Sequence, residues 1–233
     1  GTLEALCGTD NISGVQPSKF DSPFQRAHMQ YKLANLVTEL KQGEVLADAE
    51  LKAITSGEPA TVEHKNKDPF VMRPYATCWF GTNHLPHTRD FSEAFFRRAV
   101  VLDFNRVFGE QEKDSNLLDK LTAELSGILN LCLDAYTTAL EFGFTDPSSS
   151  KVAKQKWRLE TDQVQQFVSE SCLMGPSYTI KSSLLYSTYK SWAFENGIKK
   201  TLGSRNFAER LERIGYGRVR RNDAVYVSGL KSN

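Results

Sequence analysis

The stretch KLANLVTEL, residues 32–40, decides the fold that the chain predicts. Its apolar residues suit a buried β-strand, and the carboxylate of Glu39 stands near its end, before a polar turn at residues 41–44. A strand of this kind carries an acid to its exposed tip. Glu39 is therefore the first candidate for a functional residue.

Downstream of this strand, the pattern predicts a short helix and a hairpin. Residues 48–56 have apolar side chains at helical spacing, and a glycine follows as a helix stop. The runs ATVEH and FVMRP, residues 60–64 and 70–74, flank a basic turn. Two such runs around a polar turn predict a β-hairpin with a basic tip.

Two further runs predict buried strands. The first, ATCWFGTN, spans residues 76–83 and ends at Asn83. The second, AVVLDF, spans residues 99–104 and directly follows the pair Arg97 and Arg98. Strands that alternate with helices predict an α/β fold for this part of the chain.

Apolar residues at helical spacing predict helices over residues 90–97 and 114–142. The predicted domain organisation therefore has four parts. Residues 1–110 form the α/β core and residues 111–145 a helical subdomain. Residues 146–156, which include Pro-Ser-Ser-Ser, form a linker, and residues 157–233 form a second domain.

The second domain predicts three helices followed by a hairpin, the pattern of a winged helix. The helices span residues 157–172, 182–195 and 205–214, with Ser204 as the cap of the third, and the hairpin joins residues 217–219 to 224–227. Tyr186, Tyr189 and Trp192 fall on the apolar face of the second helix, so we expect them in the core and not as a base-stacking platform.

The two parts of the chain differ in net charge, although the net charge of the whole chain is only +1. Up to Pro147 there are 14 Lys and Arg against 21 Asp and Glu, and from Ser148 onward there are 15 against 7. A balance of +8 in a small domain is typical of proteins that bind polyanions, although a solvated basic face has the same composition.

Composition also excludes several classes of protein. The chain has 233 residues and 40% hydrophobic residues, enough for ordinary packed cores. It has no apolar run of the roughly 20 residues that a membrane helix needs and no signal-peptide pattern at its start. The four cysteines have no CxxC spacing, so no zinc site is predicted. We expect a cytoplasmic protein without a membrane partner.

These runs, in this order, resemble the core of superfamily-3 helicases of the poxvirus, phage and plasmid primase type. The resemblance covers roughly residues 7–108, from the strand that ends in an acid to the arginine pair and its strand. Residues 184–197 and 204–230 are similar to the C-terminal domain of phage and plasmid primases. The resemblance implies an AAA+-like P-loop NTPase core that assembles as a ring, usually a hexamer, around DNA.

For the nucleotide site, the resemblance implies four residues. Glu39 resembles the Walker B acid, which binds Mg²⁺ or orients the attacking water, although the family often has two acids where this chain has Thr38-Glu39. Asn83 resembles the sensor that hydrogen-bonds the terminal phosphate. Arg97 and Arg98 resemble a pair of which one reaches the neighbouring subunit's nucleotide. Surface ion pairs with Glu93 or Asp90 are the alternative for this pair.

For DNA, the resemblance and the charge imply three groups of residues. The basic tip of the first hairpin, the exposed side of the third helix of the second domain and the second hairpin would contact phosphates. A solvated turn is the alternative for the first group. The candidates are His64, Lys65, Lys67, Arg205, Asn206, Arg210, Arg218, Arg220 and Arg221.

The phosphate-binding pattern GxxxxGK[ST] does not occur in the 233 residues. We therefore expect this chain to be the later part of a longer phage, prophage or plasmid protein that binds ATP and Mg²⁺, and we expect no cofactor on the chain itself. The predicted function is that of an ATP-dependent DNA helicase and primase acting in replication in a bacterial host. The alternatives are a non-catalytic origin-binding or regulatory protein on a decayed ATPase core, and a transcriptional regulator.

Overall fold

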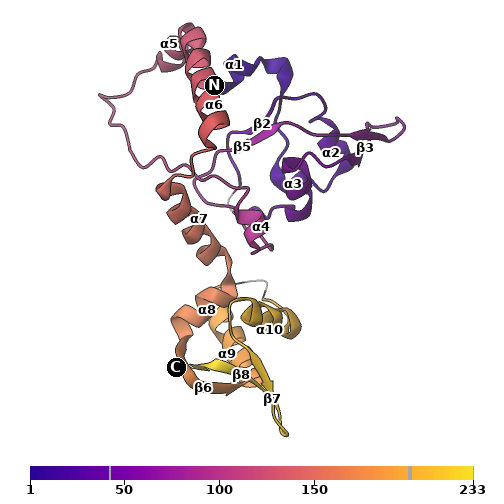
Figure 1. Ribbon diagram of the computed structural model, residues 1–233, viewed down its shortest axis with the longest axis vertical. Coiled ribbons are helices and arrows are strands. Elements are labelled where there is room, and N and C mark those ends of the chain that lie inside the picture. Colours follow the sequence, from indigo (N-terminus) through magenta and orange to yellow (C-terminus); the bar gives the residue numbers. More distant parts are fainter. Residues whose placement is uncertain (42, 199–200, 233) are drawn as a thin grey trace. The chain divides into compact units, whose positions relative to one another are not determined.

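A computed structural model of the chain describes residues 1–41, 43–198 and 201–232 (Figure 1). The chain divides into two compact units, unit 1 at Gly1–Lys154 and unit 2 at Gln155–Asn233. Each unit has a hydrophobic core of its own. Among the described residues, no helix is both long enough and apolar enough to cross a membrane.

Unit 1 combines short helices with a small parallel sheet and a separate hairpin (Figure 1). Its elements are α1 (Thr2–Cys7), η1 (Thr9–Asn11), β1 (Ile12–Ser13), η2 (Pro17–Lys19), α2 (Pro23–Ala27), β2 (Ala34–Val37), α3 (Asp48–Thr55), β3 (Ala60–Val62), β4 (Phe70–Met72), β5 (Thr77–Phe80), α4 (Glu93–Phe96), α5 (Leu117–Ala123), α6 (Leu125–Phe142) and the first half of α7 (Ser148–Thr161). The predicted strand at residues 32–40, the helix at 48–56 and the hairpin at 60–74 are confirmed as β2, α3 and β3 with β4.

The sheet has the order β1-β2-β5, and both pairings are parallel. Asn35 of β2 is fully buried, and its side chain holds the segment around β1 against the sheet. Its Oδ1 accepts hydrogen bonds from Ser13 Oγ and Val15 N, both at 2.8 Å, and its Nδ2 donates to Val15 O at 2.9 Å. A buried amide is tolerated here because its hydrogen-bonding groups are satisfied.

The prediction of a strand at residues 99–104 is wrong. The segment belongs to no strand, and Val100, Leu102 and Phe104 are exposed, Phe104 to 92%. An apolar extended segment becomes a strand only when a neighbouring strand satisfies its backbone. In the described part of the chain, the sheet ends at β5, and residues 99–104 pair with neither of its edges.

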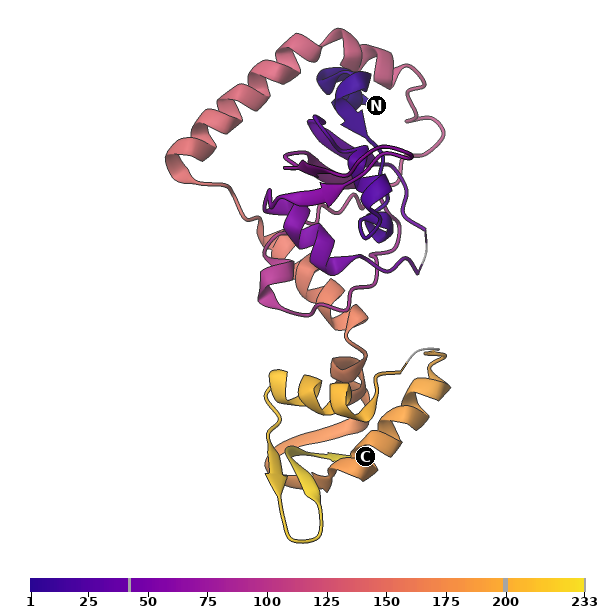
Figure 2. The ribbon, with the colours of Figure 1, turned by 90° about the vertical axis from the view of Figure 1, so that its right-hand side faces the viewer.

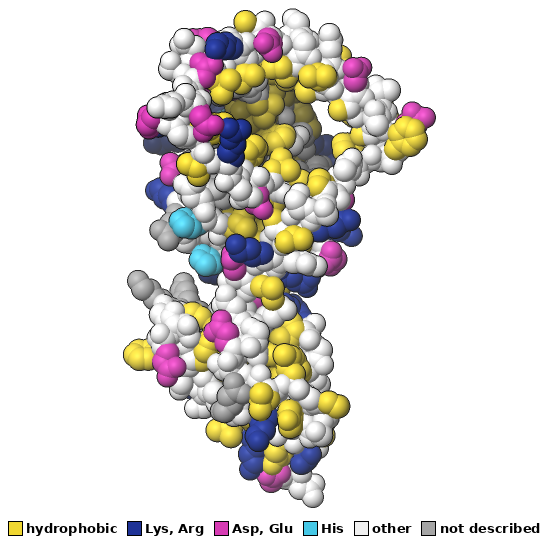
Figure 3. Space-filling model, turned by 90° about the vertical axis from the view of Figure 1, so that its left-hand side faces the viewer, with side chains coloured by type: hydrophobic (Ala, Val, Ile, Leu, Met, Phe, Trp, Pro, Cys, Tyr) yellow, Lys and Arg dark blue, Asp and Glu magenta, His cyan; other side chains and the backbone are white. Residues whose placement is uncertain are grey.

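Other apolar side chains of unit 1 are exposed as well. The predicted helix at residues 114–142 is two helices, α5 and α6, and none of the 18 residues of α6 is buried. Leu131, Leu140 and Phe142 are at least 70% exposed. Figure 3 shows a hollow in unit 1 that is lined by hydrophobic side chains.

The predicted linker at residues 146–156 is mostly helical. Helix α7 begins at Ser148, and Ser150 is fully buried, where its Oγ accepts a hydrogen bond from Val101 N at 3.0 Å. The boundary between the units therefore falls inside α7 and not in an irregular linker. Ser148, Ser149 and Ser150 are thus the first three residues of a helix.

Unit 2 packs three helices against an antiparallel sheet (Figure 2). Its elements after α7 are α8 (Gln163–Ser171), β6 (Cys172–Lys181), α9 (Ser182–Glu195), α10 (Ser204–Arg213), β7 (Arg218–Arg220) and β8 (Val225–Ser232). The sheet order is β6-β8-β7. The predicted second helix is confirmed with its bounds, as α9.

Three details of unit 2 differ from the sequence predictions. The predicted helix at residues 157–172 is broken at Asp162, whose side chain caps α8 by accepting from Val164 N and Gln165 N. Strand β6 was not predicted, because Gly175 and Pro176 interrupt it and its register with β8 shifts there. The N-cap of α10 is Gly203, so Ser204 is the first helical residue and not the cap.

Aromatic side chains form the core of unit 2, as predicted for the stripe on α9. Tyr189 is fully buried, Trp192 is 7% exposed, and Tyr186 packs against the core from its edge. The Tyr189 ring stacks on Phe207 of α10 with centroids 4.5 Å apart, and Phe167 of α8 meets Tyr189 edge-on at 5.6 Å. The three helices are therefore joined through one aromatic cluster.

A buried ion pair joins α8 to α10. Arg210 Nε donates to Asp162 Oδ2 at 2.8 Å, a second nitrogen of Arg210 bonds the same oxygen, and Asp162 is fully buried. Because the other oxygen of Asp162 caps α8, one carboxylate fixes the beginning of one helix and its contact with another. Removal of the arginine would leave a carboxylate buried without its cation.

We predict that Arg210→Met destabilises unit 2 by about 3–5 kcal/mol, because it leaves the buried Asp162 carboxylate unpaired. Hydrogen exchange of amides in α8 and α10, measured in the whole chain, reports this loss as faster exchange. Arg205→Met is the matched control, since Arg205 is exposed and its ion pair with Glu209 contributes at most about 1 kcal/mol. Equal exchange in the two variants would show that the buried pair does not support unit 2.

Candidate functional site

The parallel pairing of β2 and β5 places the segments that follow them at one edge of the sheet. Val37 and Phe80 are paired at the ends of the two strands. The pairing continues beyond the strands, since Gly81 N donates to Val37 O at 2.8 Å and Leu40 N donates to Gly81 O at 3.0 Å. Glu39 and Asn83 lie in these two segments, and both are exposed.

Gly81 allows the two segments to approach each other. A Cβ atom at this position would lie 2.5 Å from the carbonyl oxygen of Thr38, the residue before Glu39. Real Cβ atoms do not approach backbone so closely, so a larger residue would push the Thr38 segment away. Gly81 is not among the residues predicted from the sequence, although a glycine directly after an apolar run is a signal of close backbone approach.

A side-chain hydrogen bond shapes the turn that carries Asn83. Thr82 Oγ1 donates to His84 O at 2.5 Å and accepts from His84 N at 3.1 Å. These bonds close the backbone around Asn83 and leave its own side chain exposed at the edge. A carboxylate and a neutral amide at the same sheet edge can together bind a polar ligand and orient a water molecule.

The arginine pair lies at the end of α4. Arg97 caps this helix, and Arg98 donates from Nη2 to Ser56 Oγ at 2.9 Å and from Nη1 to the carbonyl oxygen of Ala94. Both arginines are exposed. The hydrogen bonds of Arg98 attach it to α3 and α4, and they do not bring it to Glu39.

The carboxylate of Asp90, one alternative partner for these arginines, binds Lys52 instead at 2.5 Å. Burial alone would raise the pKa of Asp90, but hydrogen bonds from Lys52 and Ser92 outweigh it and lower the pKa. Asp90 is therefore a charged anchor between α3 and the loop before α4. Its depressed pKa means that this contribution to stability is present at neutral pH and is lost as the pH falls through the folded-state pKa.

The hairpin of β3 and β4 exposes two of its three predicted DNA contacts. Lys65 and Lys67 are exposed, and Asn66 between them has a left-handed backbone with φ of 61°. His64 is half-buried because its ring stacks on Phe70 at 5.3 Å. The two lysines are thus available to a polyanion, while His64 supports the hairpin.

One predicted DNA contact of unit 2 is corrected by its burial. Arg210 was expected on the exposed side of α10, but it is 7% exposed and paired with Asp162. Arg205 and Asn206 are exposed, and Arg205 binds Glu209 of the same helix at 3.0 Å. Helix phase explains the correction, since Arg210 lies three residues from Phe207 and shares its inner face.

The hairpin of β7 and β8 carries the remaining arginines. Arg218 pairs with Glu212 of α10 at 2.5 Å, and Arg220 is exposed. The Arg221 guanidinium lies over the Tyr226 ring at 4.6 Å. A hydrogen bond from Lys181, at 3.0 Å, and another from the Tyr226 hydroxyl lower the pKa of Asp223 in the turn. These contacts hold the turn and place the Arg221 guanidinium over the Tyr226 ring, while Arg220 extends into solvent.

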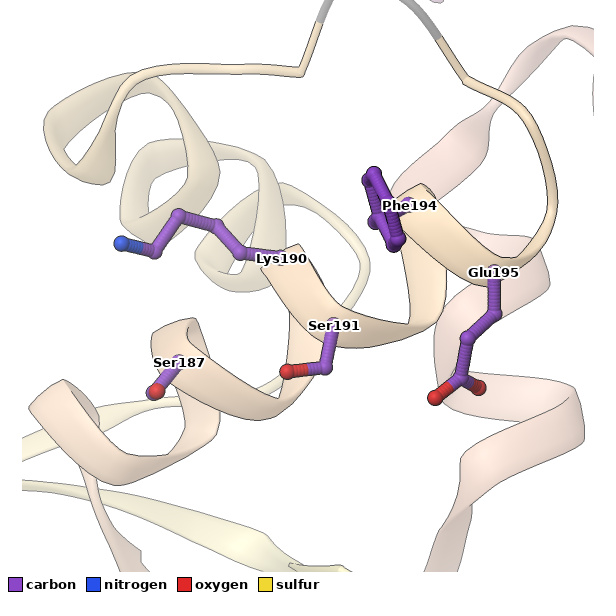
Figure 4. A pocket seen from close by; sticks show the side chains of 5 residues that line it. All are labelled: Ser187, Lys190, Ser191, Phe194 and Glu195. Carbon is purple, nitrogen blue, oxygen red and sulfur yellow. The ribbon is translucent and has the colours of Figure 1, made fainter.

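A shallow depression on α9 is a weaker candidate. It is lined by Ser187, Lys190, Ser191, Phe194 and Glu195. Figure 4 shows that these side chains fan out from the helix in different directions and do not converge on one point. Convergent polar groups are characteristic of a ligand pocket, and this depression lacks them, so we do not propose it as a binding site. The described residues also contain no group of three or more metal-binding side chains.

We predict that Gly81→Ala destabilises unit 1 by about 1–3 kcal/mol, because the added methyl group overlaps the Thr38 carbonyl. Hydrogen exchange of residues 34–40 in the whole chain measures the effect. Gly127→Ala in α6 is the matched control, since a Cβ there meets nothing within 4 Å and alanine should stabilise the helix by about 0.5–1 kcal/mol. The same response at both positions would contradict the close approach of the two segments.

Two family models match parts of the chain. Residues 1–98, which include the edge with Glu39 and Asn83, match a family described as of unknown function, DUF5906. Residues 159–217, which include α8, β6, α9 and α10, match the family described as Poxvirus D5 protein-like. The second family is one of primase and helicase proteins. The chain is therefore similar, over this part of unit 2, to proteins of viral and phage-type DNA replication.

Proposed function

We propose that this chain is the later part of an ATP-dependent DNA helicase and primase of a phage, prophage or plasmid, acting in replication in the cytoplasm of a bacterial host. The observation that carries the proposal is the parallel pairing of β2 with β5, which brings Glu39 and Asn83 to one sheet edge. The similarity of residues 159–217 to the Poxvirus D5 protein-like family supports it independently.

In this proposal, unit 1 is an AAA+-like ATPase core and unit 2 a winged-helix domain. Supporting the first assignment are the parallel sheet and the acid and amide at its edge. Three helices packed on an antiparallel sheet with a projecting β7–β8 hairpin support the second. The resemblance to superfamily-3 helicases further implies that the protein assembles as a ring and that its partner is DNA.

Glu39 and Asn83 have separate roles in the proposed reaction. The Glu39 carboxylate accepts a hydrogen bond from the attacking water and orients it, and the Asn83 amide hydrogen-bonds the terminal phosphate without adding negative charge. A single exposed carboxylate fits a magnesium ion that takes most of its ligands from nucleotide phosphates and water. When bound with ATP, the ion would neutralise charge on the phosphates, and Glu39 is the residue that would hold it.

The chief alternative is a non-catalytic origin-binding or regulatory protein with the same fold. The absence of the GxxxxGK[ST] pattern from the 233 residues is compatible with both candidates. They differ in one measurable property, the hydrolysis of ATP by a protein in which this chain is joined to such a loop.

We predict that this chain alone has no measurable ATP turnover, and that Glu39→Gln lowers kcat by about 100-fold or more in the longer protein that contains the loop. Glu58→Gln, another exposed carboxylate of unit 1, is the matched control and should leave kcat unchanged. A longer protein with an intact loop and no hydrolysis would favour the non-catalytic candidate. Turnover by the chain alone that Glu39→Gln abolishes would show that the phosphates bind elsewhere.

We further predict that active sites of the assembled protein are shared between neighbours. A variant with Arg97→Ala and Arg98→Ala, mixed with a Glu39→Gln variant, should recover part of the ATPase activity, because some interfaces then combine an intact acid with intact arginines. Each variant alone is the control. Verified mixed rings without any recovery would argue against an arginine that acts on the neighbouring subunit.

A further inference from the structure

The outer face of α10 carries no excess of positive charge. Its exposed cations, Arg205 and Arg213, are matched in number by Glu209 and Glu212, and Arg205 is paired with Glu209 at 3.0 Å. The remaining arginine, Arg210, is buried against Asp162. A helix that approaches a phosphate backbone with a balanced face gains little from long-range attraction.

The β7–β8 hairpin is different in charge. Residues 218–226, called here the C-terminal hairpin, contain three arginines and one aspartate. Within the described chain, Arg220 and Arg221 have no carboxylate within ion-pair distance, and the single acid, Asp223, is already bonded to Lys181. Figure 3 shows Lys and Arg side chains gathered at the end of unit 2 where this hairpin projects. Among the described residues of unit 2, the C-terminal hairpin therefore has three cations against one acid within a short segment, whereas the exposed charges of α10 are balanced in number.

The strand register places these cations on both faces of the C-terminal hairpin. Arg220 pairs with Val225, so it lies on the face that also bears Arg218 and the buried Val227. Arg221 stacks on Tyr226, which belongs to the opposite face because it alternates with Val225 and Val227. A narrow hairpin with cations on both faces can reach phosphates on both walls of a groove.

The aromatic side chains of unit 2 do not favour single strands. Phe167, Tyr189, Trp192 and Phe207 are in the core, and Arg221 lies over the ring of Tyr226. Proteins that bind single strands without sequence preference stack the bases on exposed aromatic rings. Phe194 on α9 is exposed, but it belongs to the depression whose side chains do not converge.

From these observations we infer that unit 2 binds the backbone of duplex DNA through the C-terminal hairpin, and not through α10, and that its binding is independent of base sequence. The inference rests on the proposed function, since it takes DNA as the ligand. It makes unit 2 a clamp on the duplex and not a reader of an origin sequence, because phosphate contacts position a protein without specifying bases.

The test compares two double variants of the whole chain. Fluorescence anisotropy measures the affinity for two 20-base-pair duplexes of unrelated sequence and for one matching single strand, over a range of salt concentrations. Arg220→Ala with Arg221→Ala should weaken binding to both duplexes and flatten the slope of log affinity against log salt by up to about two units. Arg205→Ala with Asn206→Ala, on the exposed face of α10, is the matched control and should leave the slope unchanged.

The outcomes separate this inference from the proposed function. Two results together support the inference. The affinities for the two duplexes differ by far less than the roughly thousandfold ratio at which specific recognition begins. Only the Arg220 and Arg221 variant loses affinity. A loss confined to the α10 variant, a strong preference for one duplex or tighter binding of the single strand would overturn it, while DNA binding itself would stand. No binding by the unmodified chain at low salt would remove the DNA-binding part of the proposed function. Circular dichroism confirms that both variants are folded.

Discussion

The pairing of β2 with β5 is the interaction on which the candidate site of unit 1 depends. The two strands are far apart in the sequence, and their parallel register aligns Val37 with Phe80. Gly81 then lets the chains continue in contact beyond the strands, because its lack of a side chain leaves room for the Thr38 carbonyl. Without this contact, Glu39 and Asn83 would be two unrelated polar residues on separate loops.

Unit 2 depends in a similar way on one buried charge. The Asp162 carboxylate caps α8 through one oxygen and binds Arg210 of α10 through the other. With the helices held in this way, the aromatic rings of Phe167, Tyr189 and Phe207 pack between them. The same interaction withdraws one arginine from the surface. As a result, the exposed charges of α10 are balanced in number, while the hairpin of β7 and β8 has more cations than acids.

The two units present complementary chemistry in the proposed function. Unit 1 has an acidic overall composition and exposes a carboxylate and an amide at a sheet edge, which suits the positioning of water and phosphate. Unit 2 carries the basic surface, which suits the backbone of a nucleic acid. The many exposed apolar side chains of α6 and of residues 99–108 serve neither role, and they show that part of unit 1 has no covering element within the described chain.

Local pattern in the sequence determined the elements whose formation needs few distant contacts. The bounds of α9, the hairpin at residues 60–74 and the core position of Tyr189 follow from periodicity and turn chemistry that act over a few residues. Tertiary structure alone decided the rest. The run at residues 99–104 has the composition of a strand but lacks a paired edge, and Arg210 has the composition of a surface residue but finds the buried Asp162 48 residues away. Backbone pairing and burial of charge depend on partners that are distant in the chain, so no local pattern could predict them.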